Sequence, residues 1–300
     1  MDTFRKNMYR AGGWLPDYPD SRDYTPESKP IKQMLAKTGI RSVPKNLPKK
    51  VDISQWCSPI EDQGMIGSCT AHAAVGLIEY FERKAFGKHV DASRLFLYKV
   101  TRNLMHMTGD TGAFLRTTME AMVLFGAPPE EHYPYQTDKY DIEPPAFAYS
   151  LAQNFQTVKY MRLDPFVTPK QTLVDRIKEY VHNGIPSMFG FTCFEGISFA
   201  MKADSTGRMS GDIPYPPRSA KQQGGHAISI VGYDDDRVIQ GDMQGSPRTT
   251  GAFKIRNSWG TSWGDGGYGW LPYKYVLDGL ADDFWCVLSK EYIDTEVFKH

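Results

Sequence analysis

The fold of this chain is decided at residues 63–69, which read Gln-Gly-Met-Ile-Gly-Ser-Cys and lead into a helical pattern. Ser68 is a good N-cap, since its hydroxyl can accept a bond from an unpaired N–H, and Gly87 offers a C-terminal stop. The predicted buried stripe consists of Ala74, Leu77, Ile78 and Phe81. Cys69 therefore falls in the first turn, where the N–H groups and the helix dipole favour the nucleophilic thiolate.

Two later stretches contain the residue types that act together with a nucleophilic cysteine. Residues 224–233, Gly-Gly-His-Ala-Ile-Ser-Ile-Val-Gly-Tyr, place His226 at the mouth of an apolar strand. Residues 254–264, Lys-Ile-Arg-Asn-Ser-Trp-Gly-Thr-Ser-Trp-Gly, place Asn257 at a strand end ahead of two tryptophans. Cysteine, histidine and asparagine in this order, with Gln63 ahead of the cysteine, resemble the papain-like cysteine peptidases.

The order of the predicted elements favours an α+β fold in two segregated halves, because helices come first and strands later. The resemblance covers most of the chain from about residue 47. It implies a papain-like two-domain fold, with a helical domain, an antiparallel β-barrel-like domain and the active-site cleft between them. We place an N-terminal arm at residues 1–46, the helical half with the nucleophile at 47–160, and the β-rich half with His and Asn at 161–300. The predicted helices cover residues 68–86, 115–125 and 169–184, with a further one starting after Ser93. The predicted strands are 185–194, 226–233, 251–257, 267–271 and 284–289.

The resemblance also implies a role for each residue of the site. Cys69 attacks a peptide carbonyl, and His226 stabilises the thiolate and then gives its proton to the leaving amine. Asn257 orients the imidazole through its other ring nitrogen, and Trp259 shields that contact from water. Gln63 donates a side-chain N–H to the oxyanion, beside the backbone N–H of Cys69. The implied activity is that of a cysteine endopeptidase.

Residues 108–114 resemble the family's substrate-binding strand, in which two adjacent glycines admit a peptide to the backbone. Here Gly112 is followed by Ala113, whose methyl group narrows the cleft. The pocket for an apolar or aromatic substrate side chain is expected to be lined by Phe114, Leu115 and Phe189. Gly225 stands before the histidine where many relatives carry an aspartate, which predicts an altered pH profile.

The cysteines argue against a disulfide-rich secreted scaffold. They are Cys57, Cys69, Cys193 and Cys286. If Cys69 stays free, the other three cannot all pair within the chain. Many papain-like enzymes carry a disulfide from the position three before the nucleophile, which is Ile66 here, to a position that corresponds to Asp110. Both ends are missing together, so we expect a chain that folds without this bridge.

Length and composition are those of an ordinary globular protein: 300 residues, 41% hydrophobic and 23% charged. The formal net charge is zero, which argues against nucleic acid or an anionic membrane as partner. No apolar run approaches the roughly 18 residues of a spanning helix. The chain start lacks an apolar signal core, and the localisation stays open. We expect a monomer without cofactor or metal, and the acidic run 234–236 is expected to be a solvated hairpin turn, not a calcium loop.

Residues 1–46 form an arm rich in proline and aromatic residues, with a short helix over residues 31–37. One interpretation is a loosely packed segment. The other is an inhibitory segment in the active-site cleft, since papain-like enzymes are commonly made with a pro-segment. Trp14, Tyr18 and Tyr24 favour the second, because aromatic side chains gain from burial. The sequence leaves both interpretations open.

Three functions are compatible with these motifs. The first is an endopeptidase acting on a peptide or protein substrate, and the second transfers the acyl unit to an amine or thiol with the same groups. The third is a catalytically silent scaffold that binds a ligand in its cleft, which the complete set of four site residues disfavours. His72 is a rival base three residues after Cys69, but on the same helix its side chain should point along the cylinder.

Overall fold

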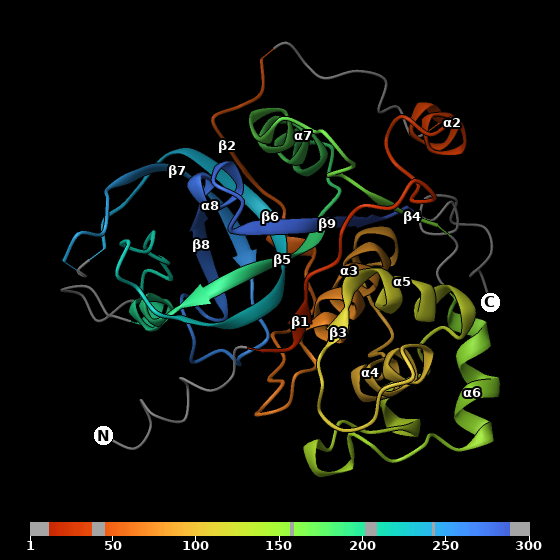
Figure 1. The fold of residues 1–300 in the computed structure, drawn as a ribbon. Coiled ribbons are helices and arrows are strands. Elements are labelled where there is room, and N and C mark those ends of the chain that lie inside the picture. Colours follow the sequence, from red (N-terminus) through yellow and green to blue (C-terminus); the bar gives the residue numbers. More distant parts are fainter. Residues whose placement is uncertain (1–11, 38–45, 157–158, 202–208, 242–243, 289–300) are drawn as a thin grey trace.

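Four of the helices lie together on one side of the molecule in the computed structural model, whereas two others pack against the sheet on the other side (Figure 1). The structure describes residues 12–37, 46–156, 159–201, 209–241 and 244–288. The helices are α2 (Lys29–Lys37), α3 (Cys69–Phe86), α4 (Arg94–Leu104), α5 (Leu115–Leu124), α6 (Ala146–Ala152), α7 (Lys170–His182) and α8 (Tyr273–Leu277). The strands are β1 (Trp14–Leu15), β2 (Lys50–Asp52), β3 (Ala113–Phe114), β4 (Tyr160–Arg162), β5 (Ser187–Phe194), β6 (Gln222–Ile239), β7 (Thr249–Arg256), β8 (Tyr268–Pro272) and β9 (Ala281–Val287). Single 3₁₀ turns lie at Ser54–Trp56, Glu130–His132, Thr137–Lys139 and Gln153–Phe155, with a longer one at Glu195–Met201.

The helical side consists of α3, α4, α5 and α6, and β1 and β3 lie between these helices and the sheet (Figure 1). The core helix α3 ends at Gly87, whose φ of 72° is the left-handed conformation that glycine adopts without strain. The predicted apolar stripe of α3 is buried. The predicted capping bond of Ser68 is wrong, because no N–H of α3 donates to its Oγ, which instead lies 2.6 Å from the Tyr135 hydroxyl. Ser93 does cap α4, where its Oγ accepts from the N–H of Phe96.

The other side is an antiparallel sheet of seven strands in the order β4-β9-β5-β6-β7-β8, with β2 paired to β6. Within the described residues the sheet is open, because β4 and β8 are not paired with each other. Its long strand β6 carries the central contacts, to β5 on one edge and to β7 on the other. The predicted α+β fold with a helical half and an antiparallel sheet is confirmed, although the sheet is barrel-like only in a loose sense.

The acidic run 234–236 was predicted to form a hairpin turn, and this prediction is wrong because β6 continues through it to Ile239. The three carboxylates can lie in a strand because each has a cationic partner on another segment. Asp234 pairs with Lys50 at 3.0 Å, Asp236 with Lys49 at 3.0 Å, and Asp235 with a lysine of α7.

The crossover between the halves contains two elements that were not predicted, α6 and β4. The helix α7 follows as expected and buries Leu173, Val174, Ile177 and Val181. Thr168 does not cap it, since its hydroxyl donates to the carbonyl of Pro165.

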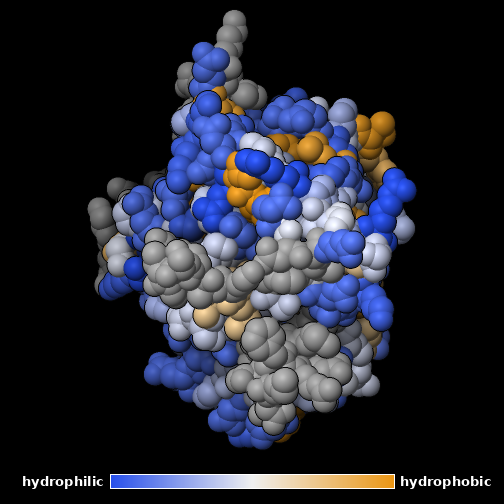
Figure 2. Space-filling view, turned by 90° about the vertical axis from the view of Figure 1, so that its left-hand side faces the viewer, coloured by the Kyte–Doolittle hydropathy of each residue, from blue (hydrophilic) through white to orange (hydrophobic). Residues whose placement is uncertain are grey.

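The face seen in Figure 2 carries mostly hydrophilic residues, with separate small apolar patches. None of the helices in the described part of the chain combines the length and apolar character of a bilayer-spanning segment.

Candidate active site

The candidate nucleophile is the first residue of α3. Cys69 is fully buried, and the backbone N–H of Ala227 on β6 donates to its Sγ at 3.4 Å. Ala227 directly follows His226, which is also fully buried. The contact therefore joins the start of α3 to β6 next to the histidine.

The ring of His226 is held by Asn257, and the geometry fixes which nitrogen carries the proton. Asn257 Oδ1 accepts from the N–H of Ser258 at 2.8 Å, so this atom is the amide oxygen. His226 Nε2 lies 2.8 Å from the same oxygen and must therefore donate to it. The other ring nitrogen, Nδ1, is buried and makes no hydrogen bond. In the neutral ring Nδ1 thus carries a bare lone pair, which is what a general base requires.

An aromatic wall covers one face of the imidazole. The ring of Trp259 stacks on His226 with centroids 4.5 Å apart and an interplanar angle of 25°. Trp263 packs edge-on against Trp259 at 5.9 Å, and both indoles are 3% exposed. This wall excludes water from that face of the imidazole.

Gln63 is linked to Asn257 by hydrogen bonds through Ser258. Its Oε1 accepts from the hydroxyl of Ser258 at 2.7 Å, and its Nε2 donates to the carbonyl of Ile66 at 3.0 Å. The two bonds fix the orientation of the amide, which is fully buried. An amide NH₂ has two donors, so Gln63 can offer an N–H to a ligand beyond the one bonded to Ile66.

The N-terminal arm runs through this site. Strand β1 pairs in parallel with β3, with Trp14 opposite Ala113 and Leu15 opposite Phe114. The carbonyl of Gly13 accepts from the N–H of Ala113 at 2.9 Å. A Cβ placed on Gly13 would lie 2.4 Å from the carbonyl oxygen of Gly67 and 2.7 Å from Cys69 Sγ. The arm is therefore in contact with the sulfur and occupies the edge of the predicted substrate-binding strand.

The indole of Trp14 fills a slot beside the nucleophile and is 7% exposed. The slot exists because two residues of neighbouring strands lack side chains. A Cβ on Gly190 would lie 1.9 Å from the indole, and one on Gly225 would lie 2.7 Å from it. Trp14 Nε1 donates to Asp283 Oδ2 at 3.1 Å. Gly225 stands where many relatives carry an aspartate, and its lack of a side chain leaves room for the indole. The sequence alone did not reveal this.

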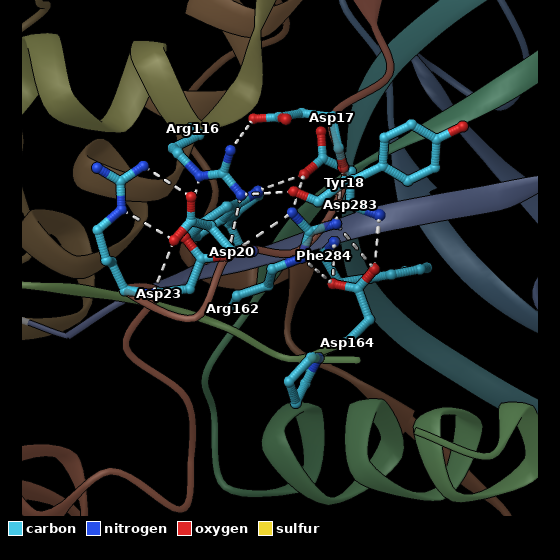
Figure 3. A network of polar contacts seen from close by, with 12 residues as sticks. Asp17, Tyr18, Asp20, Asp23, Arg116, Arg162, Asp164, Asp283 and Phe284 are labelled. Carbon is cyan, nitrogen blue, oxygen red and sulfur yellow. Dashed lines mark hydrogen bonds and ion pairs between the residues drawn. The ribbon is translucent and has the colours of Figure 1, made fainter. Parts of the chain in front are cut away.

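Two arginines hold the continuation of the arm, as Figure 3 shows. Arg116 on α5 donates through Nε and Nη2 to Asp23 at 2.9 and 3.0 Å and forms an ion pair with Asp17. Arg162 on β4 donates to the carbonyl of Asp17 at 3.0 Å. It also lies 3.2 Å from Asp283, so the arm and the end of the Trp14 slot share one polar network.

The arm-covered site is electrically neutral. Burial raises the pKa of the Cys69 thiol to about 12, although backbone N–H groups of Ala227, Thr70, Cys69 and Gly13 oppose the shift. Burial lowers the pKa of His226 to about 4, against the opposing bond to Asn257. The helix start was expected to favour a thiolate, but here desolvation outweighs it. A protonated thiol next to a neutral imidazole is the less nucleophilic form of the pair.

The carboxyl group of Asp283, which accepts from the indole of Trp14, also has a shifted pKa. Asp283 is fully buried in a positive-φ conformation, with φ 66°. Burial raises its pKa to about 7, and Arg162 and the N–H groups of Trp14 and Trp285 oppose this. Trp285 Nε1 donates to Asp283 Oδ1 at 2.7 Å.

No disulfide supports the site. All four cysteines are free and buried, and Ile66 and Asp110 carry no sulfur with which to form a bridge. A hydrogen bond joins the two loops instead, since Asp110 Oδ1 accepts from the N–H of Gly67 at 2.8 Å. The same oxygen accepts from the hydroxyl of Tyr98 at 2.6 Å.

His72 is placed as expected for a side chain that points along its helix. Its Nδ1 lies 3.1 Å from the carbonyl of Ser68, and its ring packs edge-on against Tyr135. Burial, reinforced by Arg94, lowers its pKa to about 3. These contacts give it a structural role inside the helical half.

The sequence singled out Gly225 but not the other two residues around Trp14. Gly190 interrupts an apolar strand, and such a glycine signals the close approach of another group. Asp283 stands at the start of an apolar strand, where an unpaired acid is costly. Leu115 and Phe189 are fully buried, and Phe189 stacks on Phe284 with centroids 4.9 Å apart. Their expected role as pocket residues stays a prediction.

Comparison with known proteins identifies the family. Residues 47–279 match the model of the papain family cysteine protease. The chain is 35% identical, over 96% of its length and 89% of the relative, to an uncharacterised peptidase C1-like protein of Acanthamoeba polyphaga mimivirus. It is 28% identical to cathepsin S of Bos taurus, of which it spans about half, 54%.

Solved structures agree. The crystal structure of xylellain, a cysteine protease from Xylella fastidiosa, superposes with a TM-score of 0.72 at 30% identity, covering 94% of this chain and 97% of that one. A digestive procathepsin L2 proteinase of Tenebrio molitor shares the fold, with a TM-score of 0.63 at 20% identity over 95% of this chain and 80% of that one. This chain belongs to the papain family of cysteine proteases.

Proposed function

We propose that the chain is a cysteine endopeptidase whose site consists of Cys69, His226, Asn257 and Gln63, and that its own N-terminal arm holds it inactive. The observation that carries the catalytic part is the tautomer of His226. Asn257 Oδ1 accepts a hydrogen bond from the Nε2–H of His226 at 2.8 Å, which leaves Nδ1 with a buried lone pair. Catalysis needs such a base next to the thiol.

In the proposed reaction, His226 Nδ1 accepts the proton of the Cys69 thiol, and the thiolate attacks the carbonyl carbon of the scissile bond. The carbonyl oxygen becomes an oxyanion that receives the backbone N–H of Cys69 and an N–H of Gln63. Collapse of the intermediate expels the amine, which takes the proton from His226. Water then hydrolyses the thioester with His226 again as base. Asn257 keeps the ring in place in both steps.

The position of the arm supports autoinhibition. Gly13 lies against Cys69 Sγ and takes the N–H of Ala113 at the edge that a substrate strand would use. Trp14 is buried as its aromatic character predicted, whereas Tyr18 is 84% exposed and contributes no such burial. A thiol shielded in this way keeps its proton, so removal of the arm should restore both access and the ion pair of Cys69 with His226.

The experiment keeps the arm during folding, because Trp14 and Ile31 are buried and a deletion would expose their sites. Residues 38–45 are replaced by the recognition sequence of a specific protease, and the folded chain is cut afterwards. Labelling by an epoxysuccinyl thiol-protease inhibitor and hydrolysis of a peptide library are compared before and after the cut, with Cys69→Ala as control. We expect both activities to rise on cutting and to vanish in the control.

The other two functions give different results in the same experiment. Labelling of Cys69 without hydrolysis, but with transfer to an added amine, would favour an acyltransferase. Absence of labelling in both forms would favour a silent scaffold and refute the proposal. Hydrolysis at the same rate before and after the cut would leave the peptidase but reject inhibition by the arm.

A further inference from the structure

We propose that the slot now filled by Trp14 is a substrate side-chain pocket that selects tryptophan, with Asp283 as the specificity-determining residue. The inference rests on the proposed peptidase function and adds the substrate class. It is carried by the shape of the slot, by the hydrogen bond at its end and by the charges around it.

The shape admits a wide, flat side chain. Gly190 on β5 and Gly225 on β6 both touch the indole, and neither position could carry a Cβ, which would lie 1.9 or 2.7 Å from ring atoms. The two strands are paired neighbours, so the slot has backbone walls that cannot retreat as a side chain would. Gly13 next to Trp14 touches Cys69 Sγ, which places the slot within about one residue of the reacting sulfur.

The end of the slot offers one acceptor. Asp283 Oδ1 accepts from the indole N–H of Trp285 at 2.7 Å and forms an ion pair with Arg162 at 3.2 Å. Asp283 Oδ2 accepts a hydrogen bond from the indole N–H of Trp14 at 3.1 Å. Among the described residues, this indole is the donor to that oxygen. When the arm leaves, this buried oxygen loses its donor. A substrate side chain without an N–H at this point would leave it unsatisfied, which disfavours phenylalanine.

The charges distinguish an indole from a cationic side chain. Without the arm, the polar cluster retains two arginines, Arg116 and Arg162, and two carboxylates, Asp164 and Asp283, so its formal charges cancel. An arginine or lysine of a substrate would add a charge with no buried counterion, which is costly. A neutral donor adds none. The site therefore suits tryptophan better than either phenylalanine or a basic residue.

The test uses the chain that was folded with its arm and then cut within residues 38–45. Four fluorogenic peptides differ only in the residue that is meant to enter the slot, which is tryptophan, benzothienylalanine, phenylalanine or arginine. Their hydrolysis is assayed at about pH 8. Benzothienylalanine keeps the shape of tryptophan and replaces the N–H by sulfur. We expect kcat/KM for tryptophan to exceed that of each of the others by about tenfold or more. Equal rates for tryptophan and benzothienylalanine, or a preference for arginine, would overturn the proposal.

Binding separates this inference from the peptidase function. Peptides with the sequence of residues 12–24 and either tryptophan or benzothienylalanine at position 14 are bound to the cut Cys69→Ala chain and followed by fluorescence anisotropy. About tenfold weaker binding of the sulfur analogue supports the pocket even if no hydrolysis occurs. Asparagine tolerates the positive φ at position 283. In Asp283→Asn, the ratio between the affinities for the two peptides should fall, because a neutral amide is a weaker acceptor. An unchanged ratio in this variant would assign the selectivity to another group and refute the role of Asp283.

Discussion

Arg116→Ala should open the arm without touching the catalytic residues. The guanidinium makes two bonds to Asp23, an ion pair with Asp17 and a bond to the carbonyl of Tyr18 at 2.7 Å. The side chains of Arg116 and Asp23 are 18% and 6% exposed. Exposed pairs are worth about 0–1 kcal/mol, and removal of one partner of a buried pair costs about 3–5 kcal/mol.

A partly buried clamp of this kind should contribute about 2–3 kcal/mol to holding the arm closed. Since about 1.4 kcal/mol corresponds to a factor of ten, the open fraction should rise roughly 30- to 150-fold in Arg116→Ala. The second-order rate of epoxysuccinyl labelling at Cys69, followed by mass spectrometry, should rise by the same factor. Arg116→Lys should give an intermediate rate, because lysine keeps the charge but not the two-pronged bond to Asp23.

The matched control is Arg22→Ala. This arginine is also on the network, but its side chain is 88% exposed and it pairs with Asp20 within the arm itself. Its loss should leave the labelling rate within about threefold. The buried cysteines Cys57, Cys193 and Cys286 report global unfolding, so labelling must stop at one equivalent. A labelling rate in Arg116→Ala equal to that of the unchanged chain, with the same melting temperature, would refute the clamp.

Three further results are expected. In the cut chain, Gln63→Ala should lower kcat about 100- to 1,000-fold, equivalent to about 2.7–4 kcal/mol of transition-state stabilisation, and steady-state kinetics with KM little changed would identify an oxyanion role. Burial lowers the pKa of His226 to about 4, so its ring should stay neutral from about pH 5 upward in the uncut chain and stay charged to a higher pH after cutting, when the Cys69 thiolate can pair with it, as followed by NMR. Gly190→Ala should speed labelling of Cys69 in the uncut chain, because its Cβ overlaps the indole, and combination with Trp14→Ala should add nothing further if that overlap is the cause.

The local parts of the fold could be predicted from the sequence. The apolar spacing and the glycine stop that define α3 depend on residues within one helix, and the structure places them as expected. The hydroxyl of Ser68 could not be assigned in the same way. Its partner, Tyr135, lies far along the chain, and that bond replaces the cap. A side chain with two alternative partners needs tertiary information to be placed.

The charged parts of the site were beyond sequence reasoning for a related reason. The residues of run 234–236 resemble a solvated turn until the lysines on other segments, Lys49, Lys50 and Lys178, are seen beside them. Asp283 resembles a surface acid next to Asp282, yet it is fully buried and faces Arg162. A carboxylate shows its environment only through partners brought from distant segments. This is why the proposed catalytic residues could be named from their motifs, whereas Asp283 could not.

The arm and the proposed substrate compete for the same groups, and this constrains both. Trp14 must bind well enough to keep the cleft closed, so the slot has to provide its N–H with an acceptor at Asp283. Once that acceptor is buried, it penalises every other occupant that lacks a donor. Selectivity for tryptophan is then a direct consequence of inhibition by a tryptophan. A substitution that weakens one by removing the Asp283 carboxylate should weaken the other by a similar factor, because both depend on the same hydrogen bond.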